Sequence, residues 1–283
     1  MSQREKESDV KRLGRIVNST FAFCLSFVLI TYIGFWAMAL SARVFGINST
    51  VYYYGIKFIL NDVHWSRFNI LFIFASPVFF QLLWGLISLY LFYKTEKRHS
   101  IINLVFLWSY KLGIVLGLSH FVSALLGFNE YDSPFYHTIA VVVSWLRMPK
   151  AIVIVGLIAA VSIMTYLSIS TIRPFLRMSF SFTKVNQNSR KRRFYLELVC
   201  IPAIVGSFVC TYYTFPYNFY MTVLNAILLL FILCVNLYVL NFTSITIEEI
   251  HRFQFIQKIN LPLFVILSIT LTVIYFVRGG INF

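Results

Sequence analysis

Residues 101–127 read IINLVFLWSYKLGIVLGLSHFVSALLG, an apolar run whose single charged side chain is Lys111. As a helix rising 1.5 Å per residue, this run would be about 40 Å long, more than the roughly 30 Å of hydrocarbon in a bilayer. Runs of similar length recur along the chain, and we expect membrane spans at 19–40, 68–93, 101–127, 149–172, 195–215, 219–242 and 260–278. The sequence therefore predicts an all-α fold, a polytopic transmembrane helical bundle of about seven spans, with six to eight possible.

The composition agrees with this class of fold. Hydrophobic residues make up 59% of the chain and charged residues 12%, against about 45–50% and 25% in soluble domains. Residues 1–18 form a basic segment that leads into the first span without an A-x-A cleavage site, which is typical of a retained signal anchor. We expect a single transmembrane domain over residues 19–283. Residues 137–147 are apolar enough to extend the fourth span or to lie in the interface.

The distribution of basic residues predicts the orientation. Of the 24 Lys and Arg residues, 17 fall on the same side as the N-terminus when the spans alternate, 6 fall on the other side, and Lys111 lies inside a span. By the positive-inside rule this places the N-terminus in the cytoplasm of a multi-pass cell-membrane protein, with a bacterial inner membrane favoured. The net charge of +14 is spread over loops rather than one face, which favours anionic lipid headgroups as partners and argues against nucleic acid.

A basic run, Arg190, Lys191, Arg192 and Arg193, precedes the fifth span. We expect it to contact lipid headgroups, with a docking site for an acidic partner as the alternative. Glu197 follows closely, and an ion pair with Arg192 or Arg193 at the interface is its simplest interpretation.

Two ionisable side chains lie clearly inside a span, Lys111 and His120. Such groups are costly in hydrocarbon unless they are paired or wetted. Nine residues separate them, so they point to opposite faces of one helix. Lys111 could snorkel to the interface or line a polar cavity. His120 could form a hydrogen bond across a packed helix pair, or act as a proton relay or ligand; it shares a ridge with the small residues Ser109, Gly113, Gly117 and Ala124.

Asn225 and Asn236 lie on one face of the sixth span, eleven residues apart. Two amides on a shared face indicate interhelical hydrogen bonds or a polar pathway.

The sequence gives only weak indications of metal binding, disulfide formation or catalysis. Glu130, Asp132 and His137 fall in one connection, but their spacing matches no metal-site template. The four cysteines are scattered through apolar segments, and neither a nucleophile elbow nor a P-loop is present. We therefore assign no catalytic residue, metal or cofactor. Whether the chain is an enzyme stays open, and the missing motifs favour a non-enzymatic protein.

Residues 34–46, GFWAMALSARVFG, resemble the motif helix of site-2 protease-type (M50) intramembrane metalloproteases, in which H-E-x-x-H precedes A-L-x-A-R-x-x-G. Residues 74–85, FASPVFFQLLWG, resemble the A-G-P segment that opens the next helix of that family. Gly34 and Phe35 stand at the positions of the first His ligand and the Glu, and Met38 stands at that of the second His ligand. The resemblance thus implies a degenerate member without zinc, and it implies a cytoplasmic connection after the motif helix, where the charge count predicts an external one.

Two functions remain open. The leading hypothesis is a non-catalytic membrane protein that acts as a subunit or scaffold and binds other membrane proteins, because small-residue ridges for helix packing are present and a catalytic constellation is not. The alternative is a transporter or channel for a small solute or ion, with a polar pathway near Lys111; no convincing internal repeat supports it.

Overall fold

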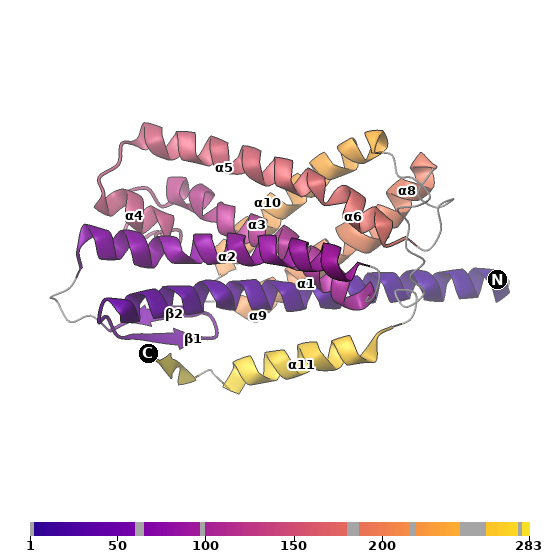
Figure 1. The fold of residues 1–283 in the computed structure, drawn as a ribbon, viewed down its shortest axis with the longest axis horizontal. Coiled ribbons are helices and arrows are strands. Elements are labelled where there is room, and N and C mark those ends of the chain that lie inside the picture. Colours follow the sequence, from indigo (N-terminus) through magenta and orange to yellow (C-terminus); the bar gives the residue numbers. More distant parts are fainter. Residues whose placement is uncertain are drawn as a thin grey trace.

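The computed structural model describes residues 3–59, 65–96, 100–179, 187–215, 219–243, 259–276 and 279–283; the side chains of residues 3–10, 100 and 276 are not described. The predicted all-α bundle is confirmed. Its longer helices run side by side along one axis (Figure 1). They are α1 (Gln3–Val44), α2 (Arg67–Thr95), α3 (Ser100–Leu126), α5 (Lys150–Ser170), α9 (Ile201–Thr214), α10 (Phe219–Val239) and α11 (Leu261–Phe276).

Among the described residues, six helical segments are long and apolar enough to cross a membrane: 11–44, 67–95, 101–126, 150–177, 188–214 and 219–242. Helices suit this environment because every backbone N–H and C=O can be satisfied within the segment. The seventh predicted span forms α11, whose 16 residues extend about 24 Å, a little less than the hydrocarbon thickness.

Contacts at both ends of α11 show that it runs the length of the bundle. Before it, the backbone N–H of Asn260 donates to Oδ1 of Asn18, early in α1. After it, strand β3 (Ile281–Asn282) pairs with β1 (Ser49–Tyr52), beyond the far end of α1. The N-terminus and C-terminus therefore lie at opposite ends of the bundle (Figure 1).

A small antiparallel sheet in the order β2-β1-β3 covers one end. Strand β2 (Gly55–Phe58) forms a hairpin with β1 in which Thr50 faces Lys57, and Thr50 Oγ1 donates to Oδ1 of Asn282 at 2.7 Å. The sequence analysis did not predict these strands, which are too short to give a recognisable alternation. We call this end of the bundle the hairpin end and the other the N-terminal end.

Helix α3 is the centre of the bundle. Of its span, 78% is buried inside the protein, against 22% for the span that contains α5 and 28% for that of α10. Trp108 of α3 is fully buried and meets Phe23 of α1 edge-on, with ring centroids 5.0 Å apart. The outer faces of α2, α5 and α11 carry exposed Phe, Ile, Val and Leu side chains, as expected of surfaces in lipid.

Three local features differ from the expected boundaries. Helix α1 continues without a break through residues 18 and 19, because neither Pro nor Gly interrupts it there. Residues 139–145 form a separate short helix, α4 (Ile139–Trp145), rather than an extension of the fourth span. The fifth span begins earlier, as α8 (Asn188–Tyr195), and enters α9 through a π-helical stretch, Leu196–Cys200.

Residues 216–218, which connect the fifth and sixth predicted spans, lie outside the described residues. The helices on either side of it, α9 and α10, are joined by a hydrogen bond of 2.9 Å between the hydroxyls of Thr214 and Thr222.

Candidate functional site

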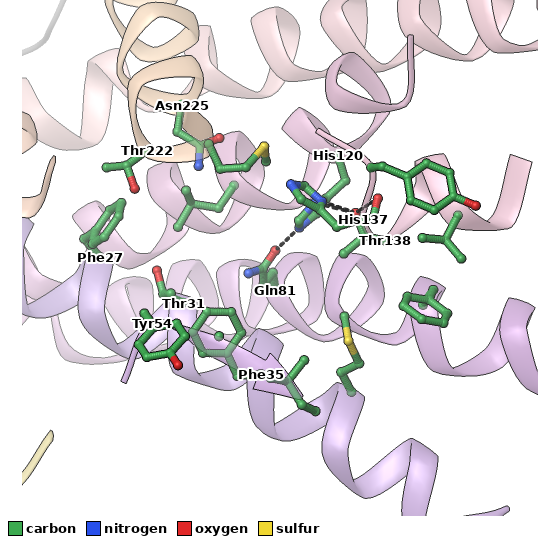
Figure 2. Close-up of a pocket in the computed structure, with 18 of the residues that line it drawn as sticks. Phe27, Thr31, Phe35, Tyr54, Gln81, His120, His137, Thr138, Thr222 and Asn225 are labelled. Carbon is green, nitrogen blue, oxygen red and sulfur yellow. Dashed lines mark hydrogen bonds between the residues drawn. The ribbon is translucent and has the colours of Figure 1, made fainter. Parts of the chain in front are cut away.

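A cavity of about 280 Å³ lies at the hairpin end, and we call it the hairpin-end cavity. Helices α1, α2, α3 and α10 supply its walls, and β2 and the connection from α3 to α4 also line it. Its apolar lining includes Phe27, Phe35, Met38, Leu116 and Met221. Its polar side chains are Thr31, Tyr54, Gln81, His120, Tyr136, His137, Thr138, Thr222 and Asn225. Figure 2 shows the two histidines beside Thr138 and Gln81, with Asn225 and Thr222 set apart near Phe27.

Four of the polar side chains form one hydrogen-bonded row. His137 Nδ1 lies 3.1 Å from Thr138 Oγ1, and Thr138 Oγ1 lies 2.9 Å from His120 Nδ1. His120 Nε2 lies 3.3 Å from Gln81 Oε1, and Gln81 Nε2 donates to the carbonyl of Ile30 at 3.3 Å. Figure 2 shows His120 linked to Gln81 on one side and to Thr138 on the other.

The hydrogen bonds along the row can all run in one direction from donor to acceptor. This direction assigns which ring nitrogen of each histidine carries the proton. Gln81 Oε1 is an acceptor, so His120 carries its proton on Nε2. Its Nδ1 then accepts from the Thr138 hydroxyl, whose one proton is shared with the carbonyl of His137 at 2.8 Å. His137 then donates from Nδ1 to Thr138 Oγ1. Both imidazoles are neutral in this arrangement, and Nε2 of His137 keeps an unused lone pair.

The backbone of Thr138 is strained. It has φ 47° and ψ −116°, outside the regions open to a β-branched residue. Strain of this kind costs about 1–3 kcal/mol and persists where surrounding contacts hold it in place. The hydroxyl of Thr138 lies within hydrogen-bonding distance of both histidine rings, so this conformation positions the row.

Gln81 is placed by a proline and a glycine. Pro77 lies inside α2 and cannot donate to the carbonyl of Ile73, but the hydroxyl of Ser76 donates to that carbonyl at 2.7 Å. One turn later, Gln81 packs on Gly34 of α1, where a Cβ atom would lie 2.6 Å from Gln81 Nε2. The amide thus fits between α1 and α3 because residue 34 has no side chain.

The lining of the hairpin-end cavity is uncharged. None of the described residues that line it is Lys, Arg, Asp or Glu. Burial lowers the pKa of His137 to about 4, because the charged ring would lose its hydration. Three buried atoms of the lining residues have no hydrogen-bond partner: Nε2 of His137, Oδ1 of Asn225 and the hydroxyl oxygen of Tyr136. The first two are acceptors and the phenol can donate or accept, so the cavity offers a ligand unused polar atoms, two of them acceptors, and no counter-charge.

Lys111 and Asn236 belong to a second network, on the other side of α3. The ammonium of Lys111 donates to Thr171 Oγ1 at 3.2 Å, and Thr171 donates to the carbonyl of Ser168 at 2.6 Å. Asn236 Nδ2 donates to Ser168 Oγ and to the hydroxyl of Tyr195, both at 3.1 Å. We call this row, which joins α3, α5, α8 and α10, the Lys111 network.

The four polar residues singled out in the sequence thus separate into two pairs. His120 and Asn225 line the hairpin-end cavity, whereas Lys111 and Asn236 do not. The opposite directions predicted for Lys111 and His120 are confirmed by their partners, Thr171 in one case and Gln81 with Thr138 in the other. Sequence reasoning missed Gln81, although a polar amide within a span is the same signal that identified Asn225. No signal pointed to Thr138.

The basic run has mixed surroundings. Arg190, Arg192 and Arg193 are exposed, but Lys191 is buried and its ammonium donates to the carbonyl of Thr243 at 2.8 Å. Lys191 therefore joins α8 to the end of α10, and a lipid headgroup would meet the three arginines instead.

Glu197 is buried and forms ion pairs with three arginine side chains. It pairs with Arg193, as the sequence suggested, and with Arg12 and Arg15 of α1, which the sequence did not indicate. This cluster fixes the N-terminal end of α1 against the start of the fifth span.

The positions that the M50 resemblance relates to zinc chemistry lie at the hairpin-end cavity. Phe35 and Met38 line it, and Gly34 contacts Gln81 beside it. Across the described part of the chain, no group of three or more His, Cys, Asp or Glu residues is placed to hold a metal ion.

Comparisons with known proteins give no relative: no family model, curated protein or solved structure matches this chain.

Proposed function

We propose that this chain is a non-catalytic multi-pass membrane protein that binds a small, uncharged and largely apolar molecule in the hairpin-end cavity. The observation that carries the proposal is the uncharged lining with two unused acceptors. Ligand sites are typically apolar clefts with a few placed polar groups. An ion entering this cavity would lose its hydration without gaining a counter-charge.

The unused acceptors favour a ligand that donates a hydrogen bond. His137 Nε2 and Asn225 Oδ1 are buried without a partner, and an unsatisfied buried polar atom costs about 1–3 kcal/mol. A hydroxyl or amide N–H on the ligand would satisfy either atom, whereas an ether or ester oxygen would not. The ligand class is therefore an apolar molecule with a hydroxyl-type donor.

The test uses purified full-length protein in neutral detergent and four probes of one chain length: octanol, octyl methyl ether, octanoate and octylammonium. Octanol should raise the thermal unfolding midpoint in a saturable way, and the ether, anion and cation should do so less. In Asn225→Leu, the affinity for octanol should fall about three- to tenfold, the effect of one hydrogen bond.

Asn236→Leu is the matched control, because it makes the same change on the same helix outside the cavity. It should keep the octanol affinity. An equal or larger response to octanoate or octylammonium would contradict the proposal, as would an unchanged affinity in Asn225→Leu.

A role as a subunit that binds other membrane proteins remains part of this proposal, with the chain as the ligand-binding component of an assembly. The small residues that suggested it serve contacts within the chain: Ser109 hydrogen-bonds Ser26, and Gly113 packs on α2. The partner surface must therefore lie elsewhere. Co-purification in mild detergent tests this role, and a monodisperse lone monomer would count against it.

A transport pathway near Lys111 receives less support than ligand binding. Lys111 and Asn236 do not line the hairpin-end cavity, and Lys111 is fully buried. Transport would require the two polar regions to connect during a conformational change.

A further inference from the structure

A second pocket, of about 400 Å³, lies at the hairpin end and shares no lining residue with the hairpin-end cavity. Its lining combines the start of α2, the connection after α3 and the end of α4. The residues are Trp65, Arg67, Tyr131, Ser144, Trp145 and Arg147. We call it the arginine pocket. Both arginines are on the side of the bundle that the positive-inside pattern leaves poor in basic residues.

Arg147 occupies a backbone position that favours glycine. Its φ is 51°, its N–H donates to Ser144 O at 3.1 Å, and the N–H of Met148 donates to Val143 O at 3.0 Å. This is the Schellman pattern that ends a helix, in which the left-handed residue is usually Gly. An arginine at this position does not stabilise the backbone conformation. We therefore infer that the side chain of Arg147 has the role.

Arg67 also lies where its charge is locally unfavourable. It is the first residue of α2, after the N-cap Ser66. The N-terminus of a helix carries a partial positive charge, which disfavours a cation there and favours an anion. Arg67 and the N-terminus of α2 thus contribute positive potential to the same pocket.

No Asp or Glu is among the described residues that line the pocket. No ion pair joins Arg67 or Arg147 to any of these residues. The hydroxyl of Ser144, also on the lining, is buried without a hydrogen-bond partner. Two guanidinium groups and an unsatisfied hydroxyl around one space are the donors that a bound oxyanion would use.

We propose that the arginine pocket binds a phosphate group. Arginine donates two parallel hydrogen bonds to phosphate oxygens, a geometry that lysine cannot match. Trp65, Tyr131 and Trp145 surround the arginines with rings of the kind that settle at headgroup depth. The phosphate belongs to a phospholipid headgroup of the leaflet at the hairpin end or to a soluble phosphate compound, and the experiment separates these sources.

The experiment titrates purified full-length protein in neutral detergent with two probes, dihexanoyl phosphatidylglycerol and inorganic phosphate. Intrinsic tryptophan fluorescence reports binding, because Trp65 and Trp145 line the pocket. At least one probe should bind saturably. Arg147→Gly removes the guanidinium and supplies the residue that the backbone prefers, so it should fold and raise the dissociation constant about tenfold or more. Arg67→Gln should have a similar effect.

Lys57→Gln is the matched control, since Lys57 is an exposed cation of β2 at the same end that does not line either cavity. It should change the dissociation constant less than twofold. Saturable binding of the lipid but not of inorganic phosphate assigns a headgroup, and the reverse assigns a soluble phosphate compound. Absence of saturable binding of both probes, or equal binding by wild type and Arg147→Gly, would overturn the proposal.

Discussion

Lys111 is fully buried, and its ammonium donates one hydrogen bond, to Thr171. It also lies over the ring of Phe175, 5.9 Å from the centroid, a contact that stabilises a cation weakly. No carboxylate among the described residues forms an ion pair with it. A buried cation with so few partners contributes little to stability and can oppose it.

Lys111→Met should therefore leave the free energy of unfolding unchanged or raise it by about 1–2 kcal/mol, because Met fills a similar volume without a charge. Thr171 keeps its hydrogen bond to Ser168. Asn236→Leu, in the same network, should lower that free energy by about 1–3 kcal/mol, since Tyr195 and Ser168 lose a partner. Unfolding by SDS measures both variants. A loss in Lys111→Met as large as that in Asn236→Leu would contradict this account.

His137 gives the fold a dependence on pH. Burial lowers its pKa from 6.5 to about 4, so below about pH 6.5 the unfolded chain binds a proton there that the folded chain does not. The free energy of unfolding should be level above pH 6.5 and fall as the pH decreases towards 4. The part due to His137 is about 2 kcal/mol at pH 5.

The measurement compares unfolding at pH 7 and pH 5 in wild type and His137→Asn. His120 lies beside His137, with ring centroids 5.9 Å apart, and is present in both proteins, so the difference between them reports His137 together with its interaction with His120. The loss of stability between the two pH values should be smaller in the variant. An equal loss in both would show that His137 does not cause it.

At the scale of elements, the closest helix packing joins α2 and α3. A Cβ atom on Gly113 would lie 2.7 Å from the carbonyl oxygen of Gln81 and 2.9 Å from Cα of Gly85. Both are backbone atoms, so the helices would have to separate to admit a methyl group. This contact brings α2 close enough to α3 for Gln81 to reach His120.

Gly113→Ala should lower the free energy of unfolding by about 1–3 kcal/mol, because overpacking shifts the backbone. The matched control is Gly156→Ala in α5, where the nearest atom would be Phe121 Cδ1 at 3.6 Å. That change should be neutral or raise stability by up to about 1 kcal/mol, the usual gain for Gly→Ala within a helix. Equal effects of the two changes would contradict the close approach.

At the scale of the whole molecule, the chain ends at the opposite end of the bundle from its start (Figure 1). The pairing of β3 with β1 fixes this arrangement. We predict that the shorter helix α11 crosses the membrane together with the six longer segments, which makes the number of crossings odd. With the positive-inside pattern, this predicts a cytoplasmic N-terminus and an external C-terminus.

Epitope tags at the two termini test this orientation in intact and permeabilised cells. The C-terminal tag should bind antibody in intact cells, and the N-terminal tag should do so only after permeabilisation. Two tags on one side would contradict the crossing by α11. The reversed pattern would contradict the charge-based orientation.

The sequence by itself determined the class of fold and the approximate spans, because these depend on hydropathy along short stretches of chain. It also identified Asn225, His120 and Lys111 as polar groups within spans, since each is a polar side chain within an apolar run. It could not show that His120 and Asn225 share a cavity from which Lys111 is excluded.

Only the tertiary structure decided which residues meet. Glu197 binds Arg15, 182 residues away in the chain, and Gln81 reaches His120 because Gly34 and Gly113 let three helices approach closely. The strained backbone of Thr138 and the left-handed backbone of Arg147 likewise depend on packing around α4. Contacts between distant segments depend on how the helices pack against one another. That packing cannot be deduced from the hydropathy of one segment.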